Sequence, residues 1–412
     1  MLERIIDISQ AGARLSVSDK RLVVEQGGEQ KASIPLGEMG ALVISHPAVV
    51  LTQPVLAGLA EAGAPVIVCD AKCLPTGMML PMVGHHLQAE RLAHQTQASA
   101  PVCKQAWRQI VQAKIRAQAR LLQDLHGDDR GLAALAERVK SGDPDNVEGQ
   151  ASRRYWPALF GNPHFRRDRD LPDQNKNLNY GYAVLRAIVA RAVCAAGLHP
   201  SLGIHHRNRY DAFALADDLM EPFRPVVDRA VAAWLRANDP LAELSPQAKA
   251  ALIQPLMACY PVQGEERSLF DIAARAAVSL TRIFAGAAKN LVLPELRVMK
   301  QQHLQLSGYK GMWLFALFDL PTDTTEDIRN YTRFRKTLLQ LGFDMLQYSV
   351  YARYCADEDA SKVHRKRVRQ ALPPKGHVRV LAVTDRQFGK MEVYMGKKRE
   401  QTEQPPDQML LL

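Results

Sequence analysis

The residue types best suited to chemistry in this sequence are acids and histidines that lie near arginines in the middle of the chain. Glu148 precedes a stretch of helical character that carries Arg153 and Arg154. A carboxylate beside two guanidinium groups suits a metal ion that also holds a phosphate, because the acid binds the cation and the arginines bind phosphate oxygens. A surface ion pair gives the same pattern. This motif therefore predicts metal chemistry only together with further ligands.

The second motif is a pair of histidines, His205 and His206, between Gly203 and two arginines. The pair follows Gly197, which is typical of a helix end, so we expect the histidines on a loop. At such a place an imidazole is either a metal ligand or an ordinary structural histidine, and the sequence alone leaves both interpretations open.

The third motif is an acidic group, Asp217, Asp218 and Glu221. On a helix the two aspartates fall four and three residues before the glutamate, so the three acids would share one face and repel one another. A metal ion or a basic partner would relieve this repulsion, whereas the alternative is a solvated acidic face. Pro222 and Pro225 interrupt the helix near Glu221, which is common where backbone geometry serves a site.

The composition of the chain favours a polyanion as its partner. The 412 residues carry a formal net charge of +10 with a pI near 9.3, and 47% of them are hydrophobic. This charge favours a nucleic acid over an acidic small molecule. No apolar run approaches the roughly 20 residues that cross a bilayer, and the first residues lack a secretory signal. The expected location is the cytoplasm, without a membrane.

The elements that must position these motifs fall into regions of different periodicity. Residues 1–90 alternate short apolar runs with turn residues, which predicts a β-rich domain with one helix at Val50–Ala62. The expected strands are Arg4–Ile8, Arg14–Val17, Leu22–Glu25, Ala41–Ile44 and Pro65–Cys69. Residues 91–298 predict an all-α domain. Its expected helices are Ala106–Leu125, Gly131–Lys140, Tyr180–Gly197, Phe213–Ala237, Ser245–Cys259 and Ser268–Leu291. Residues 299–311 are polar and contain glycine, which is typical of a linker.

Residues 312–412 begin a further domain. A strand is predicted at Met312–Phe318, and Asp323 with Glu326 indicates the cap of a helix that runs through Leu341 and ends at Gly342. The later elements expected are a strand at Met345–Tyr354, a helix at Glu358–Ala371 and strands at Val378–Val383 and Met391–Tyr394. This order resembles a ferredoxin-like sandwich. We therefore predict an α+β protein with an N-terminal β-rich domain, a central all-α catalytic domain and a C-terminal ferredoxin-like domain.

The motifs carry a resemblance to a known family. The segments concerned are "PVIVCDAKCLPTGMMLPM", "NVEGQASRRYW", "GYAVLRAIVARAV" and "GIHHRNRYDAFALADDLMEPFRP". Over residues 1–298 they resemble the catalytic subunit of the CRISPR adaptation integrase, in the type II branch that accompanies single-protein RNA-guided effector nucleases. The resemblance implies that the N-terminal domain dimerises and that the helical domain holds a catalytic metal ion.

The resemblance also implies the ligands of that ion. The family's Glu, His and second acid fall at Glu148, His206 and Glu221. His205 is the rival to His206, which is preferred because the family commonly spaces the histidine 15 residues before the acid, as here. Asp218 matches an acidic position that lies beside the metal in some members. The side chains of Arg153 and Arg154 would be directed towards DNA phosphates. The mixed oxygen and nitrogen ligand set suits Mn²⁺ or Mg²⁺.

The C-terminal domain resembles the small ferredoxin-fold subunit of the same complex. The segments are "WLFALFDLPTDT", "YTRFRKTLLQLGFDMLQYSVYARY" and "VLAVTDRQFGKMEVYMGKKRE", within about residues 308–400. Asp319 falls on the acid that ends the family's first strand, and it is either a ligand of a second metal site or an ordinary strand-end acid. Five basic residues of the domain's second helix are predicted to contact DNA backbone. They are Lys362, Arg365, Lys366, Arg367 and Arg369.

In this family the 3′ hydroxyl of a short DNA fragment attacks a phosphodiester at the edge of a repeat array. The chain is thus expected to be a metal-dependent DNA endonuclease and integrase that works by transesterification. A hydrolytic DNA endonuclease and a non-catalytic DNA scaffold are the alternatives. Expected partners are double-stranded DNA, further copies of the chain through both the catalytic and the bridging ferredoxin-like modules, and the effector nuclease of the same system. The tail Gln408–Leu412 is expected to dock as an added strand on a catalytic module.

Overall fold

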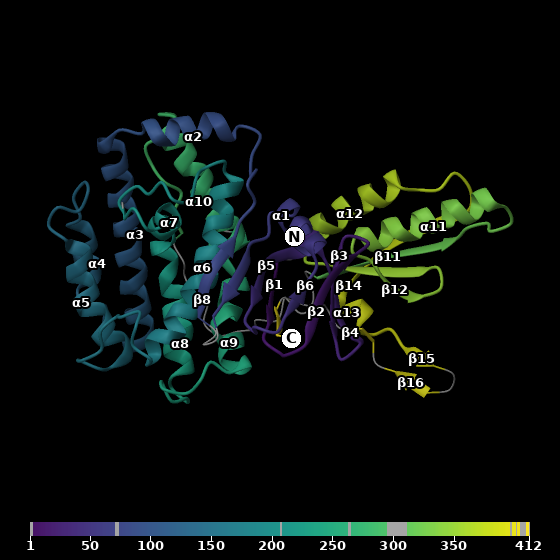
Figure 1. Cartoon of the computed structure of the whole chain (residues 1–412), viewed down its shortest axis with the longest axis horizontal. Helices are drawn as coiled ribbons and strands as arrows, with labels where there is room; N and C mark the ends of the chain where they lie inside the picture. Colours follow the sequence, from purple (N-terminus) through teal and green to yellow (C-terminus); the bar gives the residue numbers. More distant parts are fainter. Residues whose placement is uncertain are drawn as a thin grey trace.

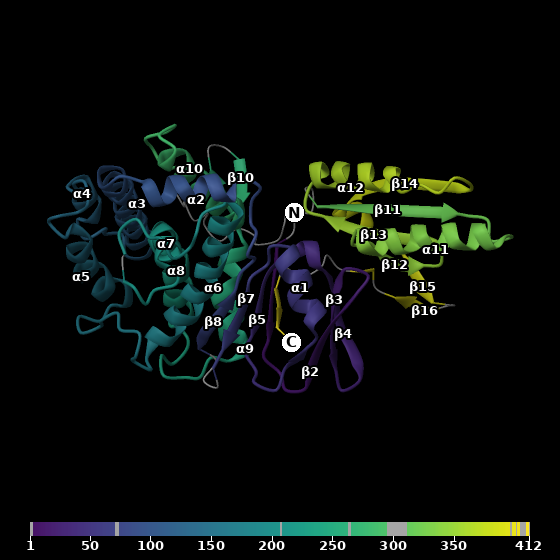
Figure 2. The same ribbon diagram turned by 45° about the horizontal axis from the view of Figure 1, so that its top comes forward.

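The computed structural model describes residues 3–70, 74–206, 208–262, 265–294, 311–395, 398–400, 402–403 and 409–411. In Figure 1 a helical region, a strand-rich region and a second mixed region lie next to one another, and the strand-rich region is in the middle. The same order is visible after rotation (Figure 2). All but the last residue of the predicted linker at 299–311 lies outside the described residues.

The strand-rich region contains two sheets. The first has the order β17-β1-β5-β7-β8, and the second has the order β4-β3-β2-β6. The bounds are β1 (Arg4–Ile8), β2 (Ala13–Ser18), β3 (Arg21–Gln26), β4 (Glu29–Pro35), β5 (Met39–Ile44), β6 (Val50–Leu51), β7 (Val66–Cys69), β8 (Pro75–Met79) and β17 (Met409–Leu411), with helix α1 at Gln53–Glu61. The five expected strands are present, whereas β4, β6 and β8 were not predicted, and Val50 and Leu51 belong to a strand and not to the helix.

Strands β1 and β5 of the first sheet bury apolar side chains on both faces of the sheet. In β5, Ala41 and Val43 join the core of the helical region, whereas Leu42 joins the core formed with the second sheet and α1. A period of two residues directs successive side chains to opposite faces of a sheet. The sheet therefore connects the helical region to the second sheet.

The helical region surrounds the candidate site. Its elements are α2 (Gln88–Gln97), α3 (Ala100–His126), α4 (Leu132–Glu137), α5 (Val147–Phe160), α6 (Gln174–Ala195), α7 (Ala214–Met220), the 3-10 turns η2 (Glu221–Phe223) and η3 (Gln254–Met257), α8 (Arg224–Trp234), α9 (Pro246–Ile253) and α10 (Leu269–Phe284), with a hairpin of β9 (Cys259–Val262) and β10 (Glu265–Ser268). Helix α2 was not predicted. The helix expected at 245–259 ends early, because Gln254 begins η3 and Cys259 begins a strand.

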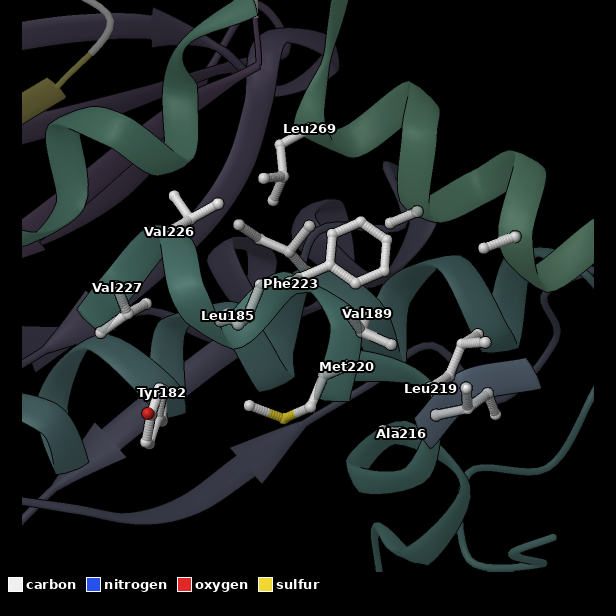
Figure 3. Packing of buried hydrophobic residues seen from close by; sticks show 14 of the residues in the cluster. Tyr182, Leu185, Val189, Ala216, Leu219, Met220, Phe223, Val226, Val227 and Leu269 are labelled. Atoms are coloured by element: carbon white, nitrogen blue, oxygen red, sulfur yellow. The ribbon is translucent and has the colours of Figure 1, made fainter. Parts of the chain in front are cut away.

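The single helix expected at 213–237 is wrong, because the segment forms α7, η2 and α8 in succession. Proline lacks an N–H group and its ring clashes with the preceding turn, so Pro222 tightens the backbone at η2. The apolar side chains of this segment still pack as one group. Figure 3 shows Leu219, Met220 and Phe223 in one cluster with Leu185 and Val189, which belong to helix α6.

The C-terminal region has the ferredoxin-like sheet that the sequence predicted, in the antiparallel order β12-β13-β11-β14. Its elements are β11 (Met312–Asp319), α11 (Thr325–Gln340), β12 (Asp344–Gln347), β13 (Val350–Cys355), α12 (Glu358–Gln370), β14 (His377–Thr384), α13 (Asp385–Phe388), β15 (Val393–Met395) and β16 (Lys398–Glu400). The strand expected at 345–354 is two strands joined at Ser349, where φ is 66°. The helix cap is Thr324, whose hydroxyl accepts from the amide of Asp327, and not Asp323 with Glu326.

Ion pairs join the C-terminal region to the N-terminal sheets, and the pair between Glu38 and Arg353 is buried. Glu38 accepts from Arg353 Nη2 at 2.5 Å, and Arg4 Nη1 lies 3.9 Å from its other oxygen. The Glu38 and Arg353 side chains are only 9% and 8% exposed. Arg21 Nη2 also contacts Asp344 Oδ1 at 2.8 Å. The stability of an ion pair that is this buried depends on both partners, because removal of one leaves an uncompensated buried charge.

The tail forms a strand of the first sheet, as expected for an added strand. Strand β17 pairs in parallel with β1, with Ile5 opposite Met409 and Asp7 opposite Leu411. The C label lies beside the N-terminal strands in Figure 1. The tail is therefore held by the N-terminal region of the same chain, through backbone pairing.

No helix within the described ranges is long and apolar enough to cross a membrane.

Candidate active site

Two acids from different elements meet at one cation in the helical region. Glu148 lies in the first turn of α5, and Glu221 opens η2. The ammonium Nζ of Lys114 on α3 lies 2.5 Å from Oε1 of Glu148 and 2.6 Å from Oε2 of Glu221. The sequence placed Glu148 before its helix, whereas it is the second residue of that helix. The structure therefore brings both predicted acids to the same point.

The start of α5 fixes the backbone of Glu148. The Asn146 side chain accepts from the amide of Gly149 at 3.0 Å, and Asp143 accepts from the amides of Val147 and Glu148 at 2.8 and 3.0 Å. These acceptors satisfy N–H groups that the helix leaves unpaired. A Cβ at Gly149 would lie 2.6 Å from Asn146 Oδ1, so a glycine is needed for the cap to approach.

Glu221 is buried between two cations. Arg224 Nη2 lies 3.0 Å from Oε1, and Lys114 lies at Oε2. Burial alone would raise the pKa of Glu221, but Arg224 and Lys114 outweigh it and hold the pKa below its ordinary value. No described residue donates a hydrogen bond of ordinary geometry to the buried Oε2. A charged oxygen in this condition suits a metal ion as its partner.

The histidine loop is held by Asp218, which is fully buried. One of its oxygens accepts from the amides of Ile204 and His205 at 2.6 and 2.8 Å, and the other lies 2.5 Å from Nδ1 of His206. The hydrogen bond to Asp218 raises the pKa of His206 above its ordinary value. A Cβ at Gly203 would lie 2.3 Å from the carbonyl oxygen of His206. The loop can therefore close on Asp218 only with a glycine there.

This arrangement distinguishes the two histidines. The Nδ1 of His206 is bound to a carboxylate, which leaves Nε2 as the ring atom for a ligand, and metal-binding histidines commonly have such a partner. The ring of His205 stacks on Trp107, with centroids 4.2 Å apart and planes 2° from parallel. Trp107 also meets the edge of His206 at 5.6 Å. The geometry thus favours His206 over His205.

The acids do not form one repelling face, as the sequence suggested, because each has its own partner. Asp217 accepts two hydrogen bonds from Arg186, at 2.6 and 2.8 Å. Asp218 binds the histidine loop and Glu221 binds two cations, as described above. All three acids are buried, so the solvated acidic face is also excluded.

Arg153 and Arg154 do not lie over this site. With about 100° per residue, positions five and six residues after Glu148 project from the far side of α5. Both side chains are exposed, and Arg154 donates to the carbonyl oxygen of Arg130 at 3.4 Å. Positive charge at the two glutamates comes instead from Lys114 and Arg224. Within the described ranges, no three His, Cys, Asp or Glu side chains converge closely enough to hold an ion, so His206 is near the acids without joining them.

Sequence reasoning missed Lys114 and Arg224. Lys114 lies in a run of buried residues on α3 with Ile110, Val111 and Ile115. A lysine on the apolar stripe of an amphipathic helix needs a buried partner, and this position was the available signal. Burial alone would lower the pKa of Lys114, but Glu221 and Glu148 raise it above its ordinary value.

A buried carboxylate lies beneath the site. Asp228 of α8 accepts hydrogen bonds from the hydroxyls of Tyr155, at 2.6 Å, and Tyr182. Burial raises the pKa of Asp228 to about 6, although both tyrosines oppose the shift. The Arg224 guanidinium lies 4.7 Å from the centroid of the Tyr182 ring. This network connects the Glu221 pair to α5 and α6.

The candidate residues of the C-terminal region lie on exposed positions. Asp319 is exposed at the end of β11 and pairs with His377 of β14 across the sheet. The five basic residues of α12 are all exposed, whereas Ser361, His364 and Val368 form the buried stripe of that helix. The helix therefore presents its positive charge to solvent.

Two family models match separate parts of the chain. The family model described as CRISPR associated protein Cas1 matches residues 6–239, and that described as CRISPR associated protein Cas2 matches residues 312–391. A CRISPR-associated endonuclease Cas1 of Neisseria meningitidis is 38% identical over 299 residues, which are 71% of this chain and 96% of that protein. A CRISPR-associated endoribonuclease Cas2 of Parvibaculum lavamentivorans is 53% identical over 100 residues, which are 24% of this chain and 99% of that protein.

Solved structures share the fold at low identity. A casposase bound to integration product has a TM-score of 0.61 and 19% identity, over 73% of this chain and 96% of that one. A Cas1 protein from Thermotoga maritima has a TM-score of 0.55 and 18% identity, over 69% of this chain and 97% of that one. The chain belongs to the Cas1 family and carries a Cas2 domain in the same polypeptide.

Proposed function

We propose that this chain is a metal-dependent integrase of CRISPR spacer acquisition, which joins the 3′-OH ends of a short DNA fragment to the repeat array by transesterification. The observation that carries the proposal is the convergence of Glu148 and Glu221 on one cation position, beside His206, whose other nitrogen is bound to Asp218. The Cas1 and Cas2 families that the chain matches, and the casposase fold, support it.

Two of the proposed ligands of a divalent ion, Glu148 and Glu221, already converge on one cation position. The buried Oε2 of Glu221 has the Lys114 ammonium 2.6 Å away, and Glu148 faces the same ammonium group. We assign these two carboxylates and Nε2 of His206 as the ligands of Mn²⁺ or Mg²⁺. When bound, such an ion lowers the pKa of the attacking hydroxyl and offsets the charge that develops on the phosphate.

The chain's own groups prepare the site for this chemistry. Arg224 holds one oxygen of Glu221 and thereby directs the other oxygen towards Glu148. Asp218 fixes the tautomer and direction of the His206 ring, and Trp107 supports the histidine loop from beneath. No protein nucleophile is required, since the attacking group belongs to the DNA.

The basic surfaces are assigned to DNA binding. The exposed guanidinium groups of Arg153 and Arg154 and the basic face of α12 neutralise phosphates without reading sequence. A hollow of about 630 Å³ between Arg130 and Arg154 adds to the first of these surfaces. The Cas2 domain bridges copies of the chain through the sheet face that α11 and α12 leave uncovered, where Leu381 is 52% exposed. The N-terminal sheets supply the second contact between copies.

We infer the type II branch from the N-terminal and central motifs, and with it the RNA-guided effector nuclease as a cytoplasmic partner. Sedimentation of the purified chain with such an effector tests this, because a complex adds a faster boundary. Unchanged boundaries for both proteins would count against the assignment.

The proposed reaction is tested with a supercoiled repeat plasmid, dye-labelled fragments and Mn²⁺. Labelled plasmid after denaturing electrophoresis indicates integration, whereas nicking without joined label indicates a hydrolytic endonuclease. Fragments with a 3′-deoxy end serve as the control, since they lack the attacking hydroxyl. If the plasmid is neither joined to label nor nicked, the chain is a non-catalytic DNA scaffold.

Variants connect the reaction to the site. We expect Glu148→Ala, His206→Ala and Glu221→Ala each to abolish joining and to leave fragment binding nearly intact, because these groups act on the chemistry and the basic surface acts on affinity. Glu137→Ala is the matched control, since Glu137 is a solvent-exposed acid of the same region. Loss of binding in parallel with joining would contradict the roles assigned.

A further inference from the structure

Lys114 occupies the position where both acids meet. Its Nζ lies 2.5 Å from Glu148 and 2.6 Å from Glu221, and only 10% of the side chain is exposed. The lysine comes from the middle of α3, whereas its partners come from α5 and η2. Three elements are therefore joined by one ammonium group.

An ammonium group and a divalent ion cannot both lie between these two oxygens. A bound Mg²⁺ requires oxygen ligands at about 2.0–2.1 Å, and the space between Glu148 and Glu221 is filled by a nitrogen in contact with both. The two cations would also repel each other at this separation. Either the ion stays out or the ammonium moves.

Lys114 can move without a change of helix. Its charge is on a flexible four-carbon stem, whereas Arg224 holds the opposite oxygen of Glu221 independently of the lysine. Glu221 would thus keep one cation when the ammonium leaves, and the backbone of Glu148 would stay fixed by Asn146 and Asp143.

We propose that Lys114 is an exchangeable internal cation, which holds Glu148 and Glu221 together until a divalent ion displaces its ammonium group from between them. This inference rests on the proposed metal site. Its consequence is that the affinity for the metal is set partly by the release of the lysine, so that the chain resists loading at low metal concentration.

The test is a titration of the full chain with Mn²⁺ in the absence of DNA, followed by the electron paramagnetic resonance of the free ion. We expect Lys114→Met to bind Mn²⁺ about tenfold more tightly than the wild type, because the methionine offers similar volume without a competing charge. Lys104→Met is the matched control, since Lys104 lies on the same helix and is exposed. An unchanged or weaker affinity in Lys114→Met would overturn the inference.

A measurement on the unaltered chain decides the matter if Lys114→Met does not fold. Amine acetylation, read by mass spectrometry, should be slow at Lys114 without metal and faster with Mn²⁺, whereas the rate at Lys104 should not change. Equal rates at Lys114 with and without Mn²⁺ would then contradict displacement.

Glu148→Ala separates the two proposals. If this variant binds Mn²⁺ as the wild type does, the proposed metal site is wrong and the inference falls with it. If Glu148→Ala loses Mn²⁺ while Lys114→Met equals the wild type, the metal site stands and only the exchange of Lys114 is refuted.

Discussion

Replacement of Asp218 by asparagine isolates the contribution of the carboxylate that holds the histidine loop. One oxygen of Asp218 accepts from two backbone amides, and the other accepts from His206. An asparagine keeps the shape but has a single acceptor oxygen, so it can serve the two amides or His206, but not both. We expect the oxygen to stay with the amides and the amide nitrogen of the new side chain to face Nδ1 of His206.

The magnitude follows from the lost hydrogen bond to the imidazole, which is much shorter than the 3.3 Å contact from the backbone amide of His206 to the same oxygen. A hydrogen bond to a charged group contributes about 1.5–3 kcal/mol, which corresponds to roughly tenfold to a hundredfold in an equilibrium constant. Loss of the partner that orients a metal-binding histidine usually costs about this much in affinity. We therefore expect Asp218→Asn to weaken Mn²⁺ binding and to slow strand joining by this factor.

The assay combines Mn²⁺ titration with a double-mutant cycle. Asp218→Asn should have no further effect in a His206→Ala background, because it acts through the imidazole. Asp217→Asn is the control, since Asp217 lies on the same helix but binds Arg186. Additive losses in the double variant, or a change of less than about twofold in the single one, would refute the reasoning.

The pH dependence gives a second criterion for the same variant. The hydrogen bond to Asp218 raises the pKa of His206, and a protonated imidazole cannot bind a metal ion. Wild-type affinity should fall as the pH drops through this raised pKa. In Asp218→Asn the fall should occur at lower pH, and coincident profiles would show that Asp218 does not act on the imidazole.

Four further outcomes are expected. Because burial raises the pKa of Asp228 from 3.8 to about 6, its ionisation opposes folding as the pH rises between these values, so the free energy of unfolding of Asp228→Asn should gain about 2 kcal/mol on the wild type from pH 4 to pH 6. Parallel denaturation curves at all pH values would contradict this. Glu38→Ala removes the carboxylate that the buried Arg353 binds at the junction with the Cas2 domain and should cost about 3–5 kcal/mol. Calorimetry should show this as a separate early transition that the exposed-site control Glu29→Ala lacks. Deletion of residues 405–412 removes the partner strand of β1, so it should speed amide hydrogen exchange in β1 and leave that of β3 unchanged. Unchanged exchange in β1 would mean that the linker, and not the tail, holds the modules together. Asp319→Ala should leave strand joining intact, and its complete loss with assembly preserved would show that the Cas2 domain does more than bridge.

The sequence predicted the elements whose pattern depends on local signals. Helix α11 ends where Gly342 takes a positive φ, and Arg4–Ile8 is a strand with the predicted bounds. The prediction of one helix at 213–237 failed because the helical periodicity of apolar residues continues through Pro222, whereas the α-helical backbone is interrupted there. The short strand β6 was missed because its pairing depends on β2, a neighbour distant in sequence, and not on its own pattern.

The candidate site was predictable in its acids and not in its cations. Glu148 and Glu221 stand in motifs that also contain arginines, so they attract notice, and the structure brings them together. Lys114 stands in an unremarkable run of helix-forming residues, and its role depends on packing between α3, α5 and η2. Arg153 and Arg154 do not share the helix face of Glu148, because adjacency in sequence on a helix directs side chains to different faces.

The pairing of β1 with β17 joins segments about 400 residues apart. At roughly 5–20 residues per second, a ribosome would synthesise the second partner about 20 to 80 seconds after the first. During that time the outer edge of β1 carries unpaired backbone groups that accept any suitable strand. The tail of another newly made copy can pair with this edge as well as the chain's own tail can. The concentration of nascent chains would therefore determine how often two copies exchange their C-terminal strands during synthesis.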